Sequence, residues 1–142
     1  MSLALDDQIC FALYAAHHAV QRLYRPLLDR LGLTYTQYLV LLVLWEQDGP
    51  SVKDLGARLH LDSGTLTPLL KRLEAAGLLR RERSTVDGRV VHVHLTAAGA
   101  ALRSDAEGVP HAVASCFGPA ADVDPVAFKR SLERVVELLE AS

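Results

Sequence analysis

The two cysteines, Cys10 and Cys116, are the side chains of this 142-residue sequence with the clearest capacity for redox chemistry. Two thiols are too few for a disulfide framework, so in a reducing compartment each is either an inert core side chain or a redox-active group. Cys10 stands between Ile9 and Phe11, a position that suits a small buried hydrophobe. As a thiolate it would instead attack the O–O bond of a peroxide and become a reversible sulfenic acid. The cysteines alone leave both interpretations open.

Three tyrosines bear on this choice. Tyr14 lies four residues after Cys10 and shares its face on a helix. Tyr24 lies 14 residues after Cys10, about 21 Å along a straight helix, so one chain does not easily bring the two together. If the first helices of two chains ran antiparallel, Tyr24 and Tyr35 of one chain would reach Cys10 of the other. Their phenolic O–H groups would then stabilise a thiolate.

A second candidate group is a small, hydroxylated and basic face on the segment 62–76. Four leucines recur at helical spacing there, which predicts a helix with one packing face. On the opposite face, hydroxyls suit base edges or phosphates, an ammonium suits a phosphate or a guanine, and a proline suits a thymine methyl. The alternative is an ordinary solvated helix face. The outward residues are Gly64, Thr67, Pro68 and Lys71, with Thr65 and Arg72 beside them.

An arginine marks the tip of a predicted hairpin. The segments 79–84 and 90–95 flank an Asp87-Gly88 turn, a pattern typical of a β-hairpin. Arg89 at this tip can enter a minor groove, where narrow A·T-rich sequence concentrates negative potential. Asp87 would orient Arg89 through a charge-assisted hydrogen bond. The alternative is an exposed hairpin with a surface ion pair of negligible energy.

Two helices must precede and support these elements. Apolar residues at helical spacing predict a first helix over residues 6–31, with a bend or interruption at Pro26. Thr34 and Gln37 form a capping box that opens a second helix over residues 35–45. This second helix is apolar nearly all round, so it belongs in the core.

The order of elements predicts the fold class. A short third helix over residues 52–60 precedes the helix 62–76 and the hairpin. Three helices followed by a hairpin indicate a winged helix-turn-helix, so the fold is mainly α with a small β-hairpin wing. Long terminal helices flank it.

The terminal segments carry apolar stripes that one small domain cannot bury. Thr96 caps a helix that Pro110 is expected to break, and a loop at Gly118 leads to a final amphipathic helix. We therefore expect a homodimer. Residues 1–34 and 100–142 are predicted to form a helical dimerisation region, and residues 35–99 the DNA-binding domain.

Charge and composition narrow the class of protein. The net charge is −2, but residues 51–100 carry eight Lys/Arg against five Asp/Glu, which leaves the remainder at −5. A basic middle with acidic ends is typical of a nucleic-acid face, although a solvated surface can produce it. No apolar run approaches the ~18 residues that cross a bilayer, and the start lacks a secretory signal, so we expect a cytoplasmic protein without membrane contact.

Histidines are the remaining candidate ligands. His92 and His94 share one strand face and could hold a metal ion. No Cys/His cluster has the spacing of a structural zinc site, so we expect solvent-facing histidines, no metal and no cofactor.

Four motifs carry a family resemblance: Gly-Leu-Thr-Tyr-Thr-Gln-Tyr at 32–38, the segment 61–74, Asp-Gly-Arg at 87–89 and Leu-Thr-Ala-Ala-Gly at 95–99. With these motifs the sequence resembles MarR-family transcriptional regulators over essentially its whole length. Two features narrow the resemblance: Asp-Ser-Gly-Thr-Leu-Thr-Pro in the helix 62–76, and Cys10 near the start of the first helix together with Tyr14, Tyr24 and Tyr35. Within the family the sequence is most similar to the organic hydroperoxide resistance regulators.

The resemblance implies a homodimeric repressor, not an enzyme, that binds a double-stranded DNA operator and is released when an organic hydroperoxide oxidises Cys10. It implies the antiparallel arrangement in which Tyr14, Tyr24 and Tyr35 hydrogen-bond the thiolate. The DNA-binding residues would be Ser63, Thr65, Thr67, Pro68, Lys71, Arg72, Asp87 and Arg89.

Other interpretations stay open. Cys116 is expected to resolve oxidised Cys10 as an intersubunit disulfide, as in the two-cysteine branch of the resemblance, whereas an inert Cys116 would leave Cys10 to be capped by a small thiol. The regulator could instead be released by a small aromatic ligand, with Cys10 only a core residue. A thiol peroxidase would leave the winged-helix pattern unexplained, and the sequence has no Cys-x-x-Cys recycling motif.

Overall fold

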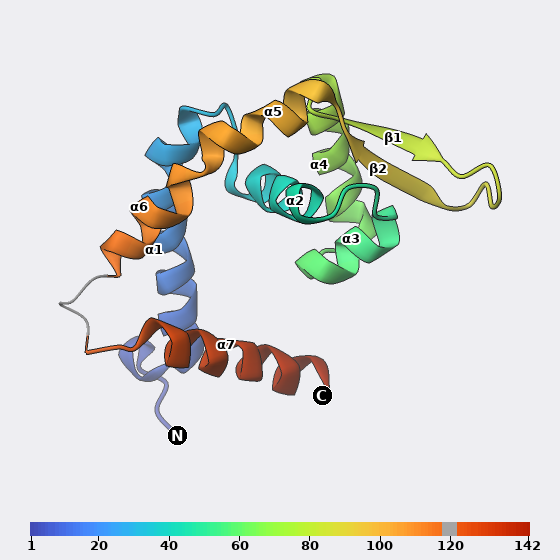
Figure 1. Ribbon diagram of the computed structural model, residues 1–142. Helices are drawn as coiled ribbons and strands as arrows, with labels where there is room; N and C mark the ends of the chain where they lie inside the picture. The colour runs from blue at the N-terminus through green and yellow to red at the C-terminus, as the bar shows by residue number, and fades with distance from the viewer. Residues whose placement is uncertain (118–121) are drawn as a thin grey trace. The chain divides into compact units, whose positions relative to one another are not determined.

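The computed structural model describes residues 1–117 and 122–142. The chain divides into two compact units, Met1–Glu107 and Gly108–Ser142. It is mostly helical with one two-stranded antiparallel hairpin (Figure 1). The elements are η1 (Leu5–Asp7), α1 (Ile9–Asp29), α2 (Tyr35–Glu46), α3 (Val52–Leu59), α4 (Ser63–Ala75), β1 (Leu79–Arg83), β2 (Val91–Leu95), α5 (Ala97–Ala106), α6 (Gly108–Cys116) and α7 (Pro125–Glu140).

Helix α1 runs without interruption through Pro26, so of the predicted bend or interruption the interruption is absent. A proline inside a helix removes one N–H donor, and here that loss falls near the C-terminal end of the helix. Leu28, two residues further on, is 1% exposed. Burial of this side chain holds the last turn of α1 in place despite the missing hydrogen bond.

Helix α2 lies at the centre of the unit Met1–Glu107, as its apolar sequence predicts. It packs against α1, α3, α4, α5 and β2. The predicted capping box is present, since Thr34 Oγ1 accepts from Gln37 N at 3.3 Å and Gln37 Oε1 accepts from Thr34 N at 3.0 Å. Its buried residues are Tyr38, Val40, Leu41 and Leu44.

Helix α4 is held by signals at both ends and by its leucine face. Asp62 caps the start, where its Oδ1 accepts from Thr65 N at 2.7 Å. Gly77 follows the end with a φ of +76°, a left-handed conformation that glycine adopts without strain. All four leucines predicted to pack are buried: Leu66, Leu69, Leu70 and Leu73. The opposite face of the helix therefore points outward.

The hairpin pairs β1 with β2 in antiparallel register, from Leu79 opposite Leu95 to Arg83 opposite Val91. The prediction of solvent-facing histidines is wrong for β2, because His92 is half-buried and the His94 side chain is only 31% exposed. Residues 49–50, which precede α3, lie against β2 and cover its two histidines. His92 Nδ1 lies 3.1 Å from the carbonyl oxygen of Gly49, and other hydrogen bonds join this segment to β2.

The helix that begins after Thr96 was predicted to break at Pro110, but the break falls at Glu107, between α5 and α6. Pro110 lies in the first turn of α6, where a missing N–H leaves no helical hydrogen bond unmade. Cys116, which its position next to Gly118 and Pro119 in the sequence places in a loop, is instead the last residue of α6. The predicted loop at Gly118 and Pro119 lies outside the described residues. Helix α7 is present as predicted.

None of the described helices is both long enough and apolar enough to span a membrane.

Candidate functional site

The outward face of α4 presents hydroxyl and basic side chains to solvent. Thr67 is half-buried, while the other candidate residues of this helix are exposed. Lys71 and Arg72 form no ion pair among the described residues, so their charges are available to an external anion. The exposed candidates are Ser63, Thr65, Pro68, Lys71 and Arg72.

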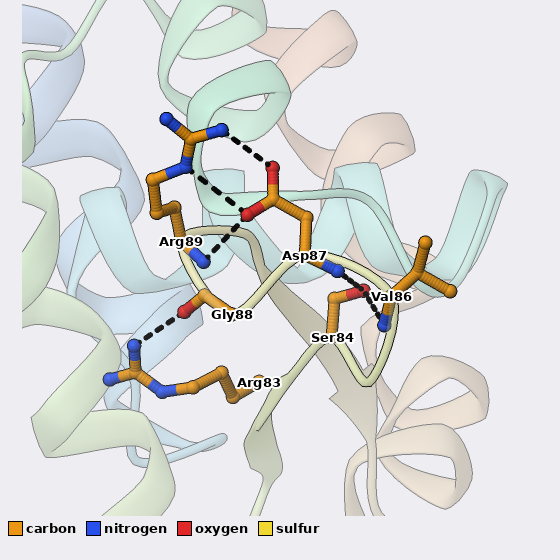
Figure 2. A network of polar contacts seen from close by, with 6 residues as sticks. All are labelled: Arg83, Ser84, Val86, Asp87, Gly88 and Arg89. Carbon is orange, nitrogen blue, oxygen red and sulfur yellow. Dashed lines mark hydrogen bonds and ion pairs between the residues drawn. The ribbon is translucent and has the colours of Figure 1, made fainter.

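The wing tip holds Arg89 in a defined position, as Figure 2 shows. Asp87 Oδ1 accepts from Arg89 N at 3.0 Å and from Arg89 Nε at 3.2 Å, and Oδ2 accepts from Nη2 at 3.4 Å. These backbone and side-chain hydrogen bonds from Arg89 lower the pKa of Asp87. The Arg89 side chain nevertheless remains 92% exposed. The predicted contact therefore orients a guanidinium that still projects into solvent.

Two further residues order this tip, and sequence reasoning missed them. Ser84 Oγ accepts from Val86 N at 3.2 Å and from Asp87 N at 3.3 Å. The guanidinium of Arg83 donates to the carbonyl oxygen of Gly88 (Figure 2). A serine three residues before an aspartate at a predicted turn is the signal that could have revealed the first contact, because serine hydroxyls commonly close such turns.

A groove lined by apolar side chains with cations among them lies between α3, α4 and the hairpin. Its volume is about 620 Å³, and its lining includes Lys53, Arg81 and Arg89 as well as the hydroxyls of Ser63 and Thr67. The groove thus joins the outward face of α4 to the wing tip, two candidate regions that the sequence placed separately. Lys53 and Arg81 had been counted only in the local charge, because sequence spacing does not show that α3 and β1 border the same groove.

Arg81 is fixed in this groove by Glu74 of α4. Glu74 Oε2 accepts from Arg81 N at 2.8 Å, and Glu74 Oε1 accepts from the Arg81 side chain at 3.0 Å. The backbone hydrogen bond, followed by the side-chain one, lowers the pKa of Glu74. The pair couples the helix to the first strand of the wing.

The Cys10 thiol is exposed in the first turn of α1. The interpretation of Cys10 as a buried core residue is therefore wrong for this single chain. Tyr14 follows one turn later, with its ring centroid 4.3 Å from that of His18, and it is 61% exposed. The backbone N–H groups of a helix start and the helix dipole both favour an anion such as a thiolate.

The other two candidate tyrosines lie together at the far end of α1. The ring centroids of Tyr24 and Tyr35 are 4.8 Å apart, and Tyr38, which sequence reasoning missed, lies 5.8 Å from Tyr24. Burial, followed by proximity to Tyr35 and Tyr38, raises the pKa of Tyr24 to about 12. Burial also raises the pKa of Tyr35. Both phenols are therefore protonated donors at neutral pH.

These phenols border a pocket of about 350 Å³ between α1 and the start of α2, which Arg25 and Thr34 also line. Cys10 does not line this pocket. The structure thus brings Tyr24 and Tyr35 together and leaves Cys10 and Tyr14, one helical turn apart, near the other end of α1. Cys116 is exposed in the second unit, with its Sγ 3.4 Å from the carbonyl oxygen of Ala112.

Comparison with known proteins places the chain in a family. Residues 22–105 match the model for the transcriptional regulators SarA/Rot. The chain is 50% identical over 108 residues to the organic hydroperoxide resistance transcriptional regulator of Bacillus subtilis, which covers 76% of this chain and 74% of that protein. The chain belongs to the SarA/Rot/MarR-type transcriptional regulators. The resemblance to organic hydroperoxide resistance regulators drawn from the motifs is confirmed.

Other members of this regulator family share the similarity. The chain is 56% identical over 119 residues to the HTH-type transcriptional regulator TtmR of Methylorubrum extorquens, a match that covers 84% of this chain but only 61% of TtmR. AbfR, a protein of Staphylococcus epidermidis, has been solved in reduced form bound to DNA; it is 36% identical, with a TM-score of 0.80 over 96% of this chain and 93% of that one. AbfR has also been solved in a disulfide form, with a TM-score of 0.68. The predicted fold class, a winged helix between terminal helices, is confirmed.

Proposed function

We propose that this regulator is a homodimeric repressor that binds a pseudo-palindromic DNA operator and is released when an organic hydroperoxide oxidises Cys10. Membership of the family supplies the coarse function, transcriptional regulation. The finer function rests on one observation. At about 100° per residue, Tyr24 lies within about 40° of Cys10 around the axis of α1, so the thiol and the phenol-lined pocket share one side of a single helix.

DNA binding follows from the surface described above. The outward face of α4 suits a major groove, and Arg89 at the wing tip suits the adjacent minor groove. Lys53, a cation on the groove between them, suits the phosphate backbone. Two copies related by a twofold axis would read half-sites about 34 Å apart. The DNA-bound form of the relative AbfR supports this arrangement.

A homodimer accounts for the exposed start of the chain. Residues 1–17 are all exposed, and Ile9 is 77% exposed on this segment. Apolar side chains of α7, such as Leu139 at 68% exposed, also lack cover. Surfaces of this kind are typical of an interface. In an antiparallel pair of α1 helices, Cys10 of each copy would meet Tyr24 and Tyr35 of the other.

Oxidation would proceed through the Cys10 thiolate. Its sulfur attacks the terminal oxygen of the hydroperoxide, so that an S–O bond forms as the O–O bond breaks, and the alkoxide leaves and takes a proton from water. Two electrons pass from sulfur to the peroxide. The phenols that stabilised the thiolate must then reposition, which shifts the paired α1 helices and changes the separation of the two α4 helices.

The test compares operator binding before and after treatment with cumene hydroperoxide. The Cys10→Ser variant is expected to bind the operator as tightly as the wild type and to stay bound after treatment, whereas the wild type dissociates. Cys116→Ser is the matched control, since it changes the other exposed thiol. If Cys10→Ser still dissociates with peroxide, the sensing group lies elsewhere. Release of Cys10→Ser by aromatic compounds alone would favour the ligand-controlled alternative.

A further inference from the structure

The pocket between α1 and α2 holds one cation that the proposed function does not use. Arg25 lines it together with Tyr24 and Tyr35. Among the described residues, the Arg25 side chain forms no ion pair and donates no hydrogen bond. Its guanidinium is permanently charged and is therefore available to an anion that enters the pocket. The pocket also has the carboxylate of Asp29 on its lining, which leaves it mixed in charge.

The register of the proposed dimer brings Arg25 to Cys10. If Cys10 of one copy lies opposite Tyr24 of the other in an antiparallel pair, then Ile9 lies opposite Arg25. Around the α1 axis, Arg25 lies within about 60° of Cys10, so it points toward the same side of the helix. Its long side chain can then reach the sulfur across the interface.

We propose that Arg25 of one copy stabilises the Cys10 thiolate of the other by direct ionic contact, and that Tyr24 and Tyr35 supply hydrogen bonds to the same sulfur. This inference rests on the proposed function. Phenols donate hydrogen bonds but carry no charge, so they favour a thiolate less strongly than a guanidinium within about 4–6 Å does. The same cation would stabilise the alkoxide that leaves when the O–O bond breaks. The ionisable groups around the thiol would be Tyr24, Arg25, Asp29 and Tyr35 of one copy and Asp6, Asp7, Tyr14 and His18 of the other.

The test is a thiolate titration in a Cys116→Ser background, so that Cys10 is the only thiol. Thiolate absorbance near 240 nm is followed against pH, and the rate of reaction with cumene hydroperoxide is measured at each pH. Arg25→Gln is expected to raise the titration midpoint by about 1 pH unit and to slow oxidation about tenfold below that midpoint. The two rates should converge at high pH, where both thiols are fully ionised. Arg25→Lys should retain most of the effect.

Arg22→Gln is the matched control, because Arg22 is an exposed arginine of the same helix that does not line the pocket. Subunit mixing tests contact across the interface. A chain with Cys10 and Arg25→Gln, mixed with a chain carrying Cys10→Ser and native Arg25, should recover the rapid reaction. Equal midpoints for Arg25→Gln and Arg22→Gln would overturn the inference. Absence of any Cys10 sulfenic acid in the parent chain would instead overturn the proposed function, and the titration would still decide the role of Arg25.

Discussion

At the scale of single residues, the proposed DNA interface depends on a few cations with distinct settings. Lys71 is an exposed ammonium without an ion pair among the described residues, whereas Arg89 is exposed but oriented by Asp87. Both charges are therefore positioned to displace counterions from phosphates or to enter a groove. Arg89 is therefore preorganised by its hydrogen bonds to Asp87, whereas Lys71 is not held in one orientation.

Removal of either charge should weaken operator binding and flatten its dependence on salt. Lys71→Ala and Arg89→Ala are each expected to reduce the slope of log affinity against log salt by about 1, since each would remove about one released counterion. Fluorescence anisotropy over a salt series measures this slope. Lys129→Ala is the control, because Lys129 pairs with Glu133 on α7. An unchanged slope for both variants would remove them from the interface.

The raised pKa of Tyr24 predicts that the folded protein loses stability in alkali. This pKa is raised to about 12 by burial and by the neighbouring phenols, while an unfolded tyrosine ionises near its ordinary value of 10.0. The unfolded chain therefore loses its proton first, so this contribution to stability is complete below pH 10 and is lost as the pH rises toward 12.

Urea unfolding between pH 9 and pH 11.5 would measure this effect. The wild type should lose stability progressively above pH 10, and Tyr24→Phe should lose less because the phenylalanine has no proton to release. Tyr14→Phe serves as the control, since Tyr14 is 61% exposed and lies outside the cluster. Parallel pH curves for the wild type and Tyr24→Phe would contradict the prediction.

At the scale of elements, the wing tip is ordered by hydrogen bonds within the turn itself. Ser84 accepts two backbone N–H groups at the tip, so its loss would loosen the segment that carries Asp87 and Arg89. Ser84→Ala is expected to weaken operator binding severalfold with an unchanged salt slope, because no phosphate contact is removed. Thr85→Ala is the matched control, because it removes a hydroxyl from the next residue of the same turn. A salt slope reduced as in Arg89→Ala would mean that Ser84 contacts DNA itself.

Helix α5 is joined to the wing at a position where only glycine fits. A Cβ at Gly99 would lie 1.9 Å from the carbonyl oxygen of Leu78, and Trp45 Nε1 donates to the carbonyl oxygen of Gly99 at 2.9 Å. Gly99→Ala should therefore destabilise the protein by about 3 kcal/mol, as overpacking forces the backbone to move. Gly108→Ala, which has open space, is the control. Thermal unfolding compares them, and equal midpoints would contradict this account of α5.

At the scale of the whole molecule, the fate of oxidised Cys10 depends on a second copy. We predict that Cys116 attacks the Cys10 sulfenic acid of the other chain, so that a disulfide forms and water leaves. Both thiols are exposed, and the relative AbfR has a disulfide form. Non-reducing electrophoresis after peroxide should show a covalent dimer for the wild type and none for Cys116→Ser. Wild type that stays monomeric and gains the mass of a small thiol would support the alternative.

The sequence alone determined the helices, the hairpin and the packing face of α4, because these follow from local signals. The capping box at Thr34 and the glycine at Gly77 are examples, since each acts within a few residues of itself. It also placed the Asp87 and Arg89 pair correctly, because both belong to one tight turn. Its error at Pro110, and the interruption that it allowed at Pro26, came from treating proline as a break irrespective of its place in a helix.

Only the tertiary structure decided which distant residues share a surface. Lys53 and Arg81 join Arg89 in one groove because α3, α4 and the hairpin pack together, and no spacing rule contains that information. Tyr38 joins Tyr24 for the same reason, since α1 and α2 pack against each other. Such contacts depend on the path of the whole chain, whereas periodicity and capping report only on neighbours along it.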